Sequence, residues 1–291
     1  MHEVPTDPAP TALLFPGQGS QTAEMREQVE RACPHLLEQA IDELGVDPFE
    51  HVDDGTAFAQ PALYCASLAG WTAANRPTAA FMAGHSLGEL AALVAAGSLD
   101  ESDGLSLAVT RGRVMQDAAE SGPQGGMLAA LGDGEKALAV ADRLGLTVAN
   151  DNAPGQLVLS GPRGALKSAR VELKAAGVRT IPLRVQGAFH SPAMAAAVPE
   201  FRAALDGVEL DEPRVPVVSS TTARPFDDIR ARLADALVRP VRWREALIAL
   251  HEAGVRRFVE TGPGTVLTGL VRRTLDAVDA RAVDVPEAAG A

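Results

Sequence analysis

The sequence predicts an α/β protein in which a large domain carries a small inserted domain. Short apolar runs alternate with helical patterns, and glycine or proline marks the joins between them, which is typical of α/β architectures. From residue 125 to residue 188 the pattern instead follows the order βαββαβ, which is the ferredoxin-like order. We therefore expect a large domain at 11–124 and 189–285, a small domain at 125–188, and tails at 1–10 and 286–291.

The individual elements follow from the apolar runs and the residues that interrupt them. In the large domain we expect strands at 12–15, 79–83 and 257–260, each soon followed by glycine or proline. A helix over 89–96 follows the second strand, and another runs from a cap at Asp100 or Ser102 to about residue 119. In the small domain we expect strands at 126–131, 147–149, 156–160 and 178–185, with helices at 134–144 and 164–176.

Composition excludes several classes of protein. The 291 residues are 46% hydrophobic and 22% charged, which suits a folded domain and excludes global disorder. A net charge of −12 argues against nucleic acid as a partner. No apolar run reaches the roughly 18 residues of a membrane span, and the N-terminus lacks a secretory pattern. Cys33 and Cys65 are too few for a disulfide framework or a zinc cluster. We expect a cytoplasmic protein.

Two stretches run against the overall acidity. Residues 163–184 hold six basic residues against one acid, and residues 239–273 hold seven arginines against three glutamates. These stretches could attract an acidic partner. Ordinary solvated helix faces explain them equally well.

The strongest local motif is GHSLG at 84–88, between an expected strand and an expected helix. This pattern is typical of a nucleophile elbow, in which a sharp turn holds the serine, here Ser86, in a strained conformation. Glycines on both sides leave room for the crowded backbone. The N–H of Leu87 and the start of the helix would then face an oxyanion.

A serine nucleophile needs a base, and His190 is the favoured candidate. It follows the last strand of the expected insertion, at a junction that faces the cleft between domains. His85 adjoins Ser86, so its side chain should diverge from the serine and pack in the core. The remaining candidates, His35, His51 and His251, read as surface residues.

Arg111 lies on the apolar stripe of its helix, unlike its neighbour Arg113, which has Asp117 one turn away. A buried guanidinium requires a strong acceptor. An internal salt bridge would satisfy it, and so would a substrate carboxylate held in bidentate fashion. The glycine-rich turns at 16–21 and 262–265 lack a P-loop signature and give only weak support for a phosphate site.

Together these segments resemble the malonyl-CoA:acyl carrier protein transacylases and the related acyltransferase domains of polyketide synthases. Eight motifs occur in the family's order over residues 11–275: FPGQGSQ at 15–21, QPA at 60–62, GHSLGE at 84–89, RGRVMQ at 111–116, NDNAPG at 150–155, AFHSP at 188–192, PVRW at 240–243 and ETGPG at 260–264. The resemblance implies an α/β-hydrolase-like large domain with a ferredoxin-like insertion, and an active site between them.

The resemblance also assigns roles. Ser86 becomes the acylated nucleophile and His190 the base, and the backbone N–H groups of Gln18 and Leu87 form the oxyanion hole. Arg111 binds the malonyl carboxylate, with Asn150 and Asn152 as supporting residues. The expected partners are malonyl-CoA and an acidic acyl carrier protein, whose phosphopantetheine arrives with the carrier. We expect a monomer without a resident cofactor or metal, and no nucleic acid or membrane partner.

Two positions refine this assignment. Phe189 precedes the histidine. Polyketide acyltransferases that resemble this chain tend to have an aromatic residue there when they select malonyl, and a small residue when they select methylmalonyl. The alternative role of Phe189 is to pack under the small domain. Ala236 stands where many members have a glutamine whose carbonyl orients the histidine. A backbone carbonyl survives that replacement.

Other functions remain in competition. The same Ser/His pair could transfer another acyl group. It could also act as a hydrolase, either a general esterase or an editing enzyme that clears stalled acyl groups from carriers. A catalytically idle scaffold is the remaining class. A general α/β-hydrolase usually has its histidine near the C-terminus, whereas about a hundred residues follow His190 here. Arg111 disfavours an editing hydrolase, because unwanted acyl groups mostly lack a free carboxylate. The carrier, and the choice between fatty acid and polyketide synthesis, stay open.

Overall fold

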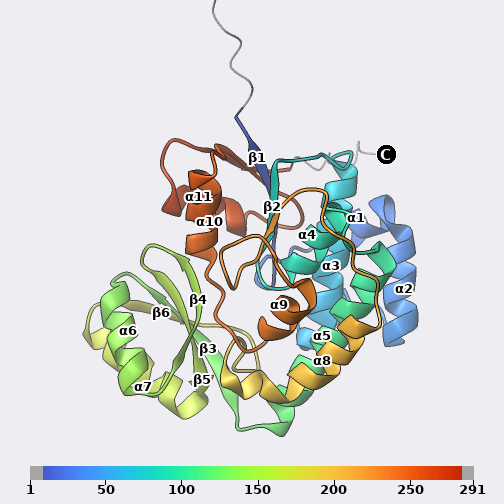
Figure 1. Ribbon diagram of the computed structural model, residues 1–291. Coiled ribbons are helices and arrows are strands. Elements are labelled where there is room, and N and C mark those ends of the chain that lie inside the picture. Colours follow the sequence, from blue (N-terminus) through green and yellow to red (C-terminus); the bar gives the residue numbers. More distant parts are fainter. Residues whose placement is uncertain (1–8, 284–291) are drawn as a thin grey trace, which may run out of the picture.

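A computed structural model of the protein describes residues 9–283, so the expected tail at 286–291 and most of the tail at 1–10 lie outside the described residues. The described chain contains a five-stranded parallel sheet and a four-stranded antiparallel sheet (Figure 1). The sequence therefore predicted the fold class correctly. No helix in residues 9–283 has the length and apolarity required to cross a membrane.

The parallel sheet has the strand order β7-β2-β1-β8-β9. Its strands are β1 (Thr11–Phe15), β2 (Phe81–Gly84), β7 (Val217–Val218), β8 (Arg257–Glu260) and β9 (Asp279–Ala282). Strand β8 has its predicted bounds. Strand β1 begins one residue before its predicted start, and β2 begins two residues later and ends one residue later than predicted. Strands β7 and β9 were not predicted, because one has only two residues and the other carries charges at a sheet edge.

Helices cover both faces of this sheet. They are α1 (Met25–Ala32), α2 (Pro34–Leu44), α3 (Thr56–Ala73), α4 (Gly88–Ala95), α5 (Glu101–Ser121), α8 (Val198–Asp206), α9 (Ile229–Asp235), α10 (Trp243–Glu252) and α11 (Val266–Thr274), with a 3-10 helix at Pro192–Ala197. The side chain of Asp100 caps α5, as one of the two predicted caps.

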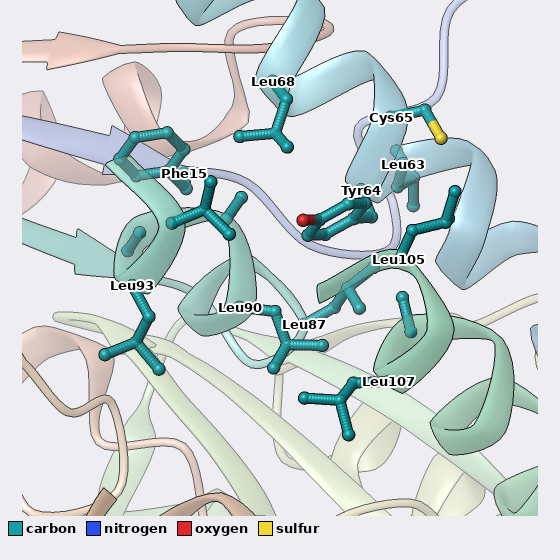
Figure 2. Packing of buried hydrophobic residues seen from close by; sticks show 14 of the residues in the cluster. Phe15, Leu63, Tyr64, Cys65, Leu68, Leu87, Leu90, Leu93, Leu105 and Leu107 are labelled. Atoms are coloured by element: carbon teal, nitrogen blue, oxygen red, sulfur yellow. The ribbon is translucent and has the colours of Figure 1, made fainter. Parts of the chain in front are cut away.

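Side chains of β1 alternate between two cores. Leu13 and Phe15 belong to the main cluster, whereas Ala12 and Leu14 belong to the cluster beneath α10 and α11, because successive residues of a strand point to opposite faces. In the main cluster, Phe15 lies among leucines of α3 and α4 (Figure 2). Both faces of the central strand β1 are thus buried, as is typical of a parallel sheet.

The small unit contains β3 (Gly125–Leu131), α6 (Gly134–Arg143), β4 (Thr147–Ala153), β5 (Gln156–Pro162), α7 (Arg163–Ala175) and β6 (Arg179–Pro182). Its sheet order is β4-β5-β3-β6 with antiparallel neighbours, so the predicted βαββαβ order is confirmed. The last strand ends at Pro182, three residues before the predicted end, and a linking segment follows it.

One face of the small sheet lies under α6 and α7, and the other packs against the large unit (Figure 1). Strand β4 also joins the large unit through backbone hydrogen bonds at Val241, which donates to Ala149 and accepts from Asp151, both at 2.8 Å. The Asp151 carboxylate in turn pairs with Arg244 at 2.6 Å. These contacts fix β4 close to the turn that carries Ser86.

Candidate active site

Ser86 occupies the sharp turn between β2 and α4. Its φ is +54°, a left-handed conformation that is strained for a residue with a side chain. The flanking glycines are required by packing, because a Cβ on Gly84 would collide with the backbone of Gly88, and one on Gly88 with the carbonyl of Phe15. The predicted sharp, strained turn between strand and helix is therefore present.

His190 lies beside Ser86 although 104 residues separate them in the chain. Its Nε2 is 2.9 Å from Ser86 Oγ. On the other side of the ring, Nδ1 is 2.8 Å from the carbonyl oxygen of Ala236 and 3.2 Å from that of Arg239. A carbonyl oxygen can only accept a hydrogen bond, so Nδ1 carries the proton and Nε2 of the neutral ring accepts from the serine hydroxyl. The alanine at 236 leaves this orientation intact.

The Arg111 side chain reaches the same hydroxyl from α5. Its Nη2 donates to Ser86 Oγ at 3.1 Å, and its Nη1 donates to Gln60 Oε1 at 2.6 Å. The residue is only 4% exposed, yet no carboxylate of residues 9–283 lies within ion-pair distance of it. The internal salt bridge considered from the sequence is absent there. By contrast, Arg113 is exposed and pairs with Asp117 and Glu200, as its surface position suggested.

Gln60 and Thr56 link Arg111 to the loop after β1. Gln60 Nε2 donates to the hydroxyl of Thr56, which donates to Gln18 Oε1, both at 2.9 Å. Sequence reasoning gave neither residue a role, although a glutamine on a nearly continuous apolar helix is itself a signal. This chain of hydrogen bonds orients the guanidinium and Gln18 together.

Burial and charge shape the titration of this site. Burial lowers the pKa of His190 to about 3, assisted by the Arg111 cation, so the imidazole is neutral at physiological pH. Burial also lowers the pKa of Arg111 to about 10 and raises that of Glu89 to about 7. Glu89 attracts the arginine from beyond ion-pair distance and accepts the N–H of Ser220 at 2.6 Å. A neutral imidazole thus lies beside a cation that has no carboxylate within ion-pair distance among residues 9–283.

Leu87 follows Ser86 in the turn after β2, and Gln18 lies in the loop after the neighbouring strand β1; both have a backbone N–H. Neither donates to another residue within 9–283. The loops that carry them follow β1 and β2, which pair side by side in register. Free N–H donors at this edge are what an oxyanion requires.

The two supporting asparagines differ. Asn152 Oδ1 accepts from Nε2 of His85 at 2.8 Å, and the His85 ring lies edge-on to Trp243 with centroids 5.3 Å apart. Burial lowers the pKa of His85, so this ring is neutral and points away from Ser86, as expected. Asn150 forms a backbone bridge with Val241, and its buried side-chain oxygen has no partner in the described chain.

A cavity of about 540 Å³ reaches Phe189, the residue before His190. Gln18, Gly55 and Gln116 line it on the large unit, and Phe189 and the segment 183–186 complete the wall. Phe189 is 5% exposed, and a Cβ on Gly187 would collide with its ring. Phe189 is therefore packed tightly in the wall of this cavity.

A second cavity, of about 650 Å³, is lined by Gly262–Gly264 and residues of α11. Within residues 9–283 no group of three or more His, Cys, Asp or Glu side chains could hold a metal ion. His35 and His51 are exposed and pair with surface carboxylates.

Comparison with known proteins identifies the family. The acyl transferase domain family matches residues 12–290. The chain belongs to this acyl transferase family. It is 35% identical to a malonyl CoA-acyl carrier protein transacylase of Escherichia coli, with 96% of this chain and 97% of that protein covered. It is also 39% identical to the polyketide biosynthesis protein ThaF of Burkholderia thailandensis, of whose length it spans only 24%.

Solved acyl transferases have the same fold. One is the malonyl-CoA:acyl carrier protein transacylase of Xanthomonas oryzae pv. oryzae, with a TM-score of 0.87, 37% identity, and 97% and 96% of the two chains covered. Another is a malonyl-transacylase in complex with its type II PKS acyl-carrier protein, with a TM-score of 0.87, 34% identity, and 96% and 97% covered.

Proposed function

We propose that this chain moves a malonyl group from malonyl-CoA to the phosphopantetheine thiol of an acyl carrier protein, in fatty acid or polyketide biosynthesis. The observation that carries the proposal is the Arg111 guanidinium, which is buried without a carboxylate partner and lies 3.1 Å from Ser86 Oγ. A malonyl thioester supplies the missing carboxylate while its carbonyl lies at the serine. The named relatives support the same substrate.

The first half-reaction forms an ester on Ser86. His190 Nε2 takes the hydroxyl proton as Oγ attacks the thioester carbonyl. The N–H groups of Gln18 and Leu87 stabilise the oxyanion. The carbon–sulfur bond then breaks, and the CoA thiolate leaves with the proton from His190.

The second half-reaction reverses these roles with a new thiol. The pantetheine thiol of the carrier gives its proton to His190, and its sulfur attacks the ester carbonyl. The carbon–oxygen bond breaks and His190 returns the proton to Ser86 Oγ. The carbonyls of Ala236 and Arg239 keep Nδ1 protonated throughout. Serine and histidine supply nucleophile and base, so we expect transfer without a resident cofactor and without inhibition by chelators.

Labelled malonyl-CoA tests the proposal. With the chain alone, label should appear on Ser86; with an added holo acyl carrier protein, it should move to the carrier. Label accumulating as free malonate at the same rate with and without carrier would contradict transfer and support hydrolysis. Absence of labelled protein would contradict the proposal that the chain forms an acyl-enzyme with malonyl-CoA.

Three further expectations belong to this proposal: an acidic carrier, a monomeric enzyme and a cytoplasmic location. Cys33 and Cys65 are buried free thiols, which suits a reducing compartment. Light scattering of the purified chain tests the monomer, and the carrier's charge is tested by the salt dependence of its KM.

A further inference from the structure

The edge of the small sheet presents an uncovered apolar surface. In the described chain β6 pairs with β3 alone, with Pro182 opposite Leu128 and Ile181 opposite Ala129. Leu128 belongs to the core under α6 and α7, whereas Ala129 belongs to the core shared with the large unit. Ile181 therefore lies on the face of the small sheet that packs against the large unit, but at an edge that the large unit leaves exposed.

Alternation along β6 groups three side chains on this face. Arg179, Ile181 and Leu183 are two residues apart, and the N–H of Leu183 continues the ladder to Met127 at 3.0 Å. Ile181 is 44% exposed and Leu183 is 36% exposed, whereas most large apolar side chains of the described residues are buried. We call Arg179, Ile181 and Leu183 the β6 patch. An exposed apolar edge of this kind is a ready site for another protein.

The β6 patch adjoins the route to Ser86. Leu183 and the next three residues line the 540 Å³ cavity that also contains Gln18 and Phe189. Arg184, the next residue, adds a cation to the cavity wall. A flexible arm entering from the patch would thus reach the cavity wall at Phe189, the residue before His190.

The two basic stretches of the sequence differ in how far their cations are already engaged. In residues 239–273 most arginines bind other groups of this chain: Arg242 pairs with Glu245, Arg244 with Asp151, Arg257 with Asp279, Arg273 bonds Gln156, and Arg256 and Arg272 bond backbone carbonyls. In residues 163–184 the side chains of Lys167, Arg170, Lys174, Arg179 and Arg184 are exposed and form no ion pair or hydrogen bond within residues 9–283.

We infer that the acyl carrier protein docks on the β6 patch, with the free cations of residues 163–184 around it, and not on residues 239–273. The inference rests on the proposed function. The occupant it requires is an acidic protein surface with apolar side chains at its centre and a pantetheine arm that enters the cavity. Such an apolar centre with a charged rim is the usual anatomy of a protein interface. Cations that are not engaged within the chain can attract this acidic surface without first breaking an internal ion pair.

Two variants test the docking site because neither residue lines the cavity or touches the reacting groups: Arg179→Glu and Ile181→Asp. Matched controls are Arg273→Glu, a cation of the engaged stretch, and Leu138→Asp, a residue of α6 that is 48% exposed. For each, three rates are measured: formation of malonyl-Ser86 from malonyl-CoA, transfer to a holo acyl carrier protein, and transfer to free pantetheine.

Both patch variants should raise the KM for the carrier about tenfold or more, with malonyl-Ser86 formation and transfer to pantetheine unchanged. Both controls should keep the wild-type KM. A normal carrier KM in the patch variants, or a raised one in Arg273→Glu, would overturn the docking site. A wild-type chain that forms no malonyl-Ser86 would instead overturn the proposed function, so the two failures are distinguishable.

Discussion

Nε2 of His85 lies 2.8 Å from Oδ1 of Asn152, and this hydrogen bond joins the turn that carries Ser86 to strand β4 of the inserted unit. Asn152 is buried and His85 is half-buried, and the His85 ring also packs edge-on against Trp243 at the start of α10. The nucleophile is thus positioned by three segments that are distant in sequence.

Asn152→Ala should lower the unfolding free energy by about 0.5–1.5 kcal/mol, because it removes the acceptor of the half-buried His85 N–H. Denaturant unfolding measures this. We also expect slower formation of malonyl-Ser86, since the turn loses a support. Ser160→Ala is the control: its hydroxyl is equally buried in β5 but has no partner within the described residues. Equal effects of both changes would deny the hydrogen bond a special role.

Ser86→Ala should abolish acyl-enzyme formation, and His190→Ala should slow both half-reactions by about 10²–10⁴, the usual cost of losing a general base. Rapid-quench measurement with labelled malonyl-CoA follows each step. His35→Ala, an exposed histidine, should behave as wild type. If the His190 variant transfers normally while another histidine variant fails, the base has been misassigned.

Arg111→Ala should lose malonyl transfer while acetyl transfer is retained or increases. An acetyl group has no free carboxylate, so it leaves a buried arginine unpaired, and the variant removes that unpaired cation. Comparing kcat/KM for malonyl-CoA and acetyl-CoA measures the switch. Arg113→Ala, two residues along the same helix but exposed, should leave the ratio unchanged. A parallel fall for both acyl groups would point to a purely structural arginine.

The acylation rate should stay constant as pH falls well below the ordinary histidine pKa. The base acts when neutral, so its activity is lost as pH falls through its pKa, and burial with Arg111 lowers that pKa to about 3. Acetyl-CoA single turnovers between about pH 5 and pH 8 measure the profile. In Arg111→Ala the falling limb should move to higher pH, since the neighbouring cation is gone. A wild-type limb near the ordinary value of 6.5 would contradict this environment.

Phe189→Ser should narrow the preference for malonyl-CoA over methylmalonyl-CoA. The ring lines the cavity beside His190, where it would meet an α-methyl group. A pocket contact of one methyl is worth about 1–3 kcal/mol, so we expect wild-type discrimination of about 10–200-fold. Competition between the two thioesters measures it. An unchanged ratio in the serine variant would mean that Phe189 only packs beneath the small unit.

Local sequence was sufficient for the features that depend on neighbouring residues. The alternation of apolar runs and the βαββαβ order predicted both sheets, and GHSLG predicted the strained turn at Ser86, because backbone conformation there follows from glycine spacing and the flanking elements. The position of Arg111 on an apolar stripe predicted its burial.

Apart from the family resemblance, the residues themselves did not decide which of these groups meet, and the tertiary structure did. His190 reaches Ser86 across 104 residues, the carbonyl of Ala236 fixes its tautomer, and Gln60 orients Arg111 from another helix. Such contacts depend on how the two units and α9 pack, and residue spacing carries no record of that packing. The free state of Arg111 was equally undecidable from sequence, because a salt bridge depends on which carboxylate the fold brings within reach of a buried cation.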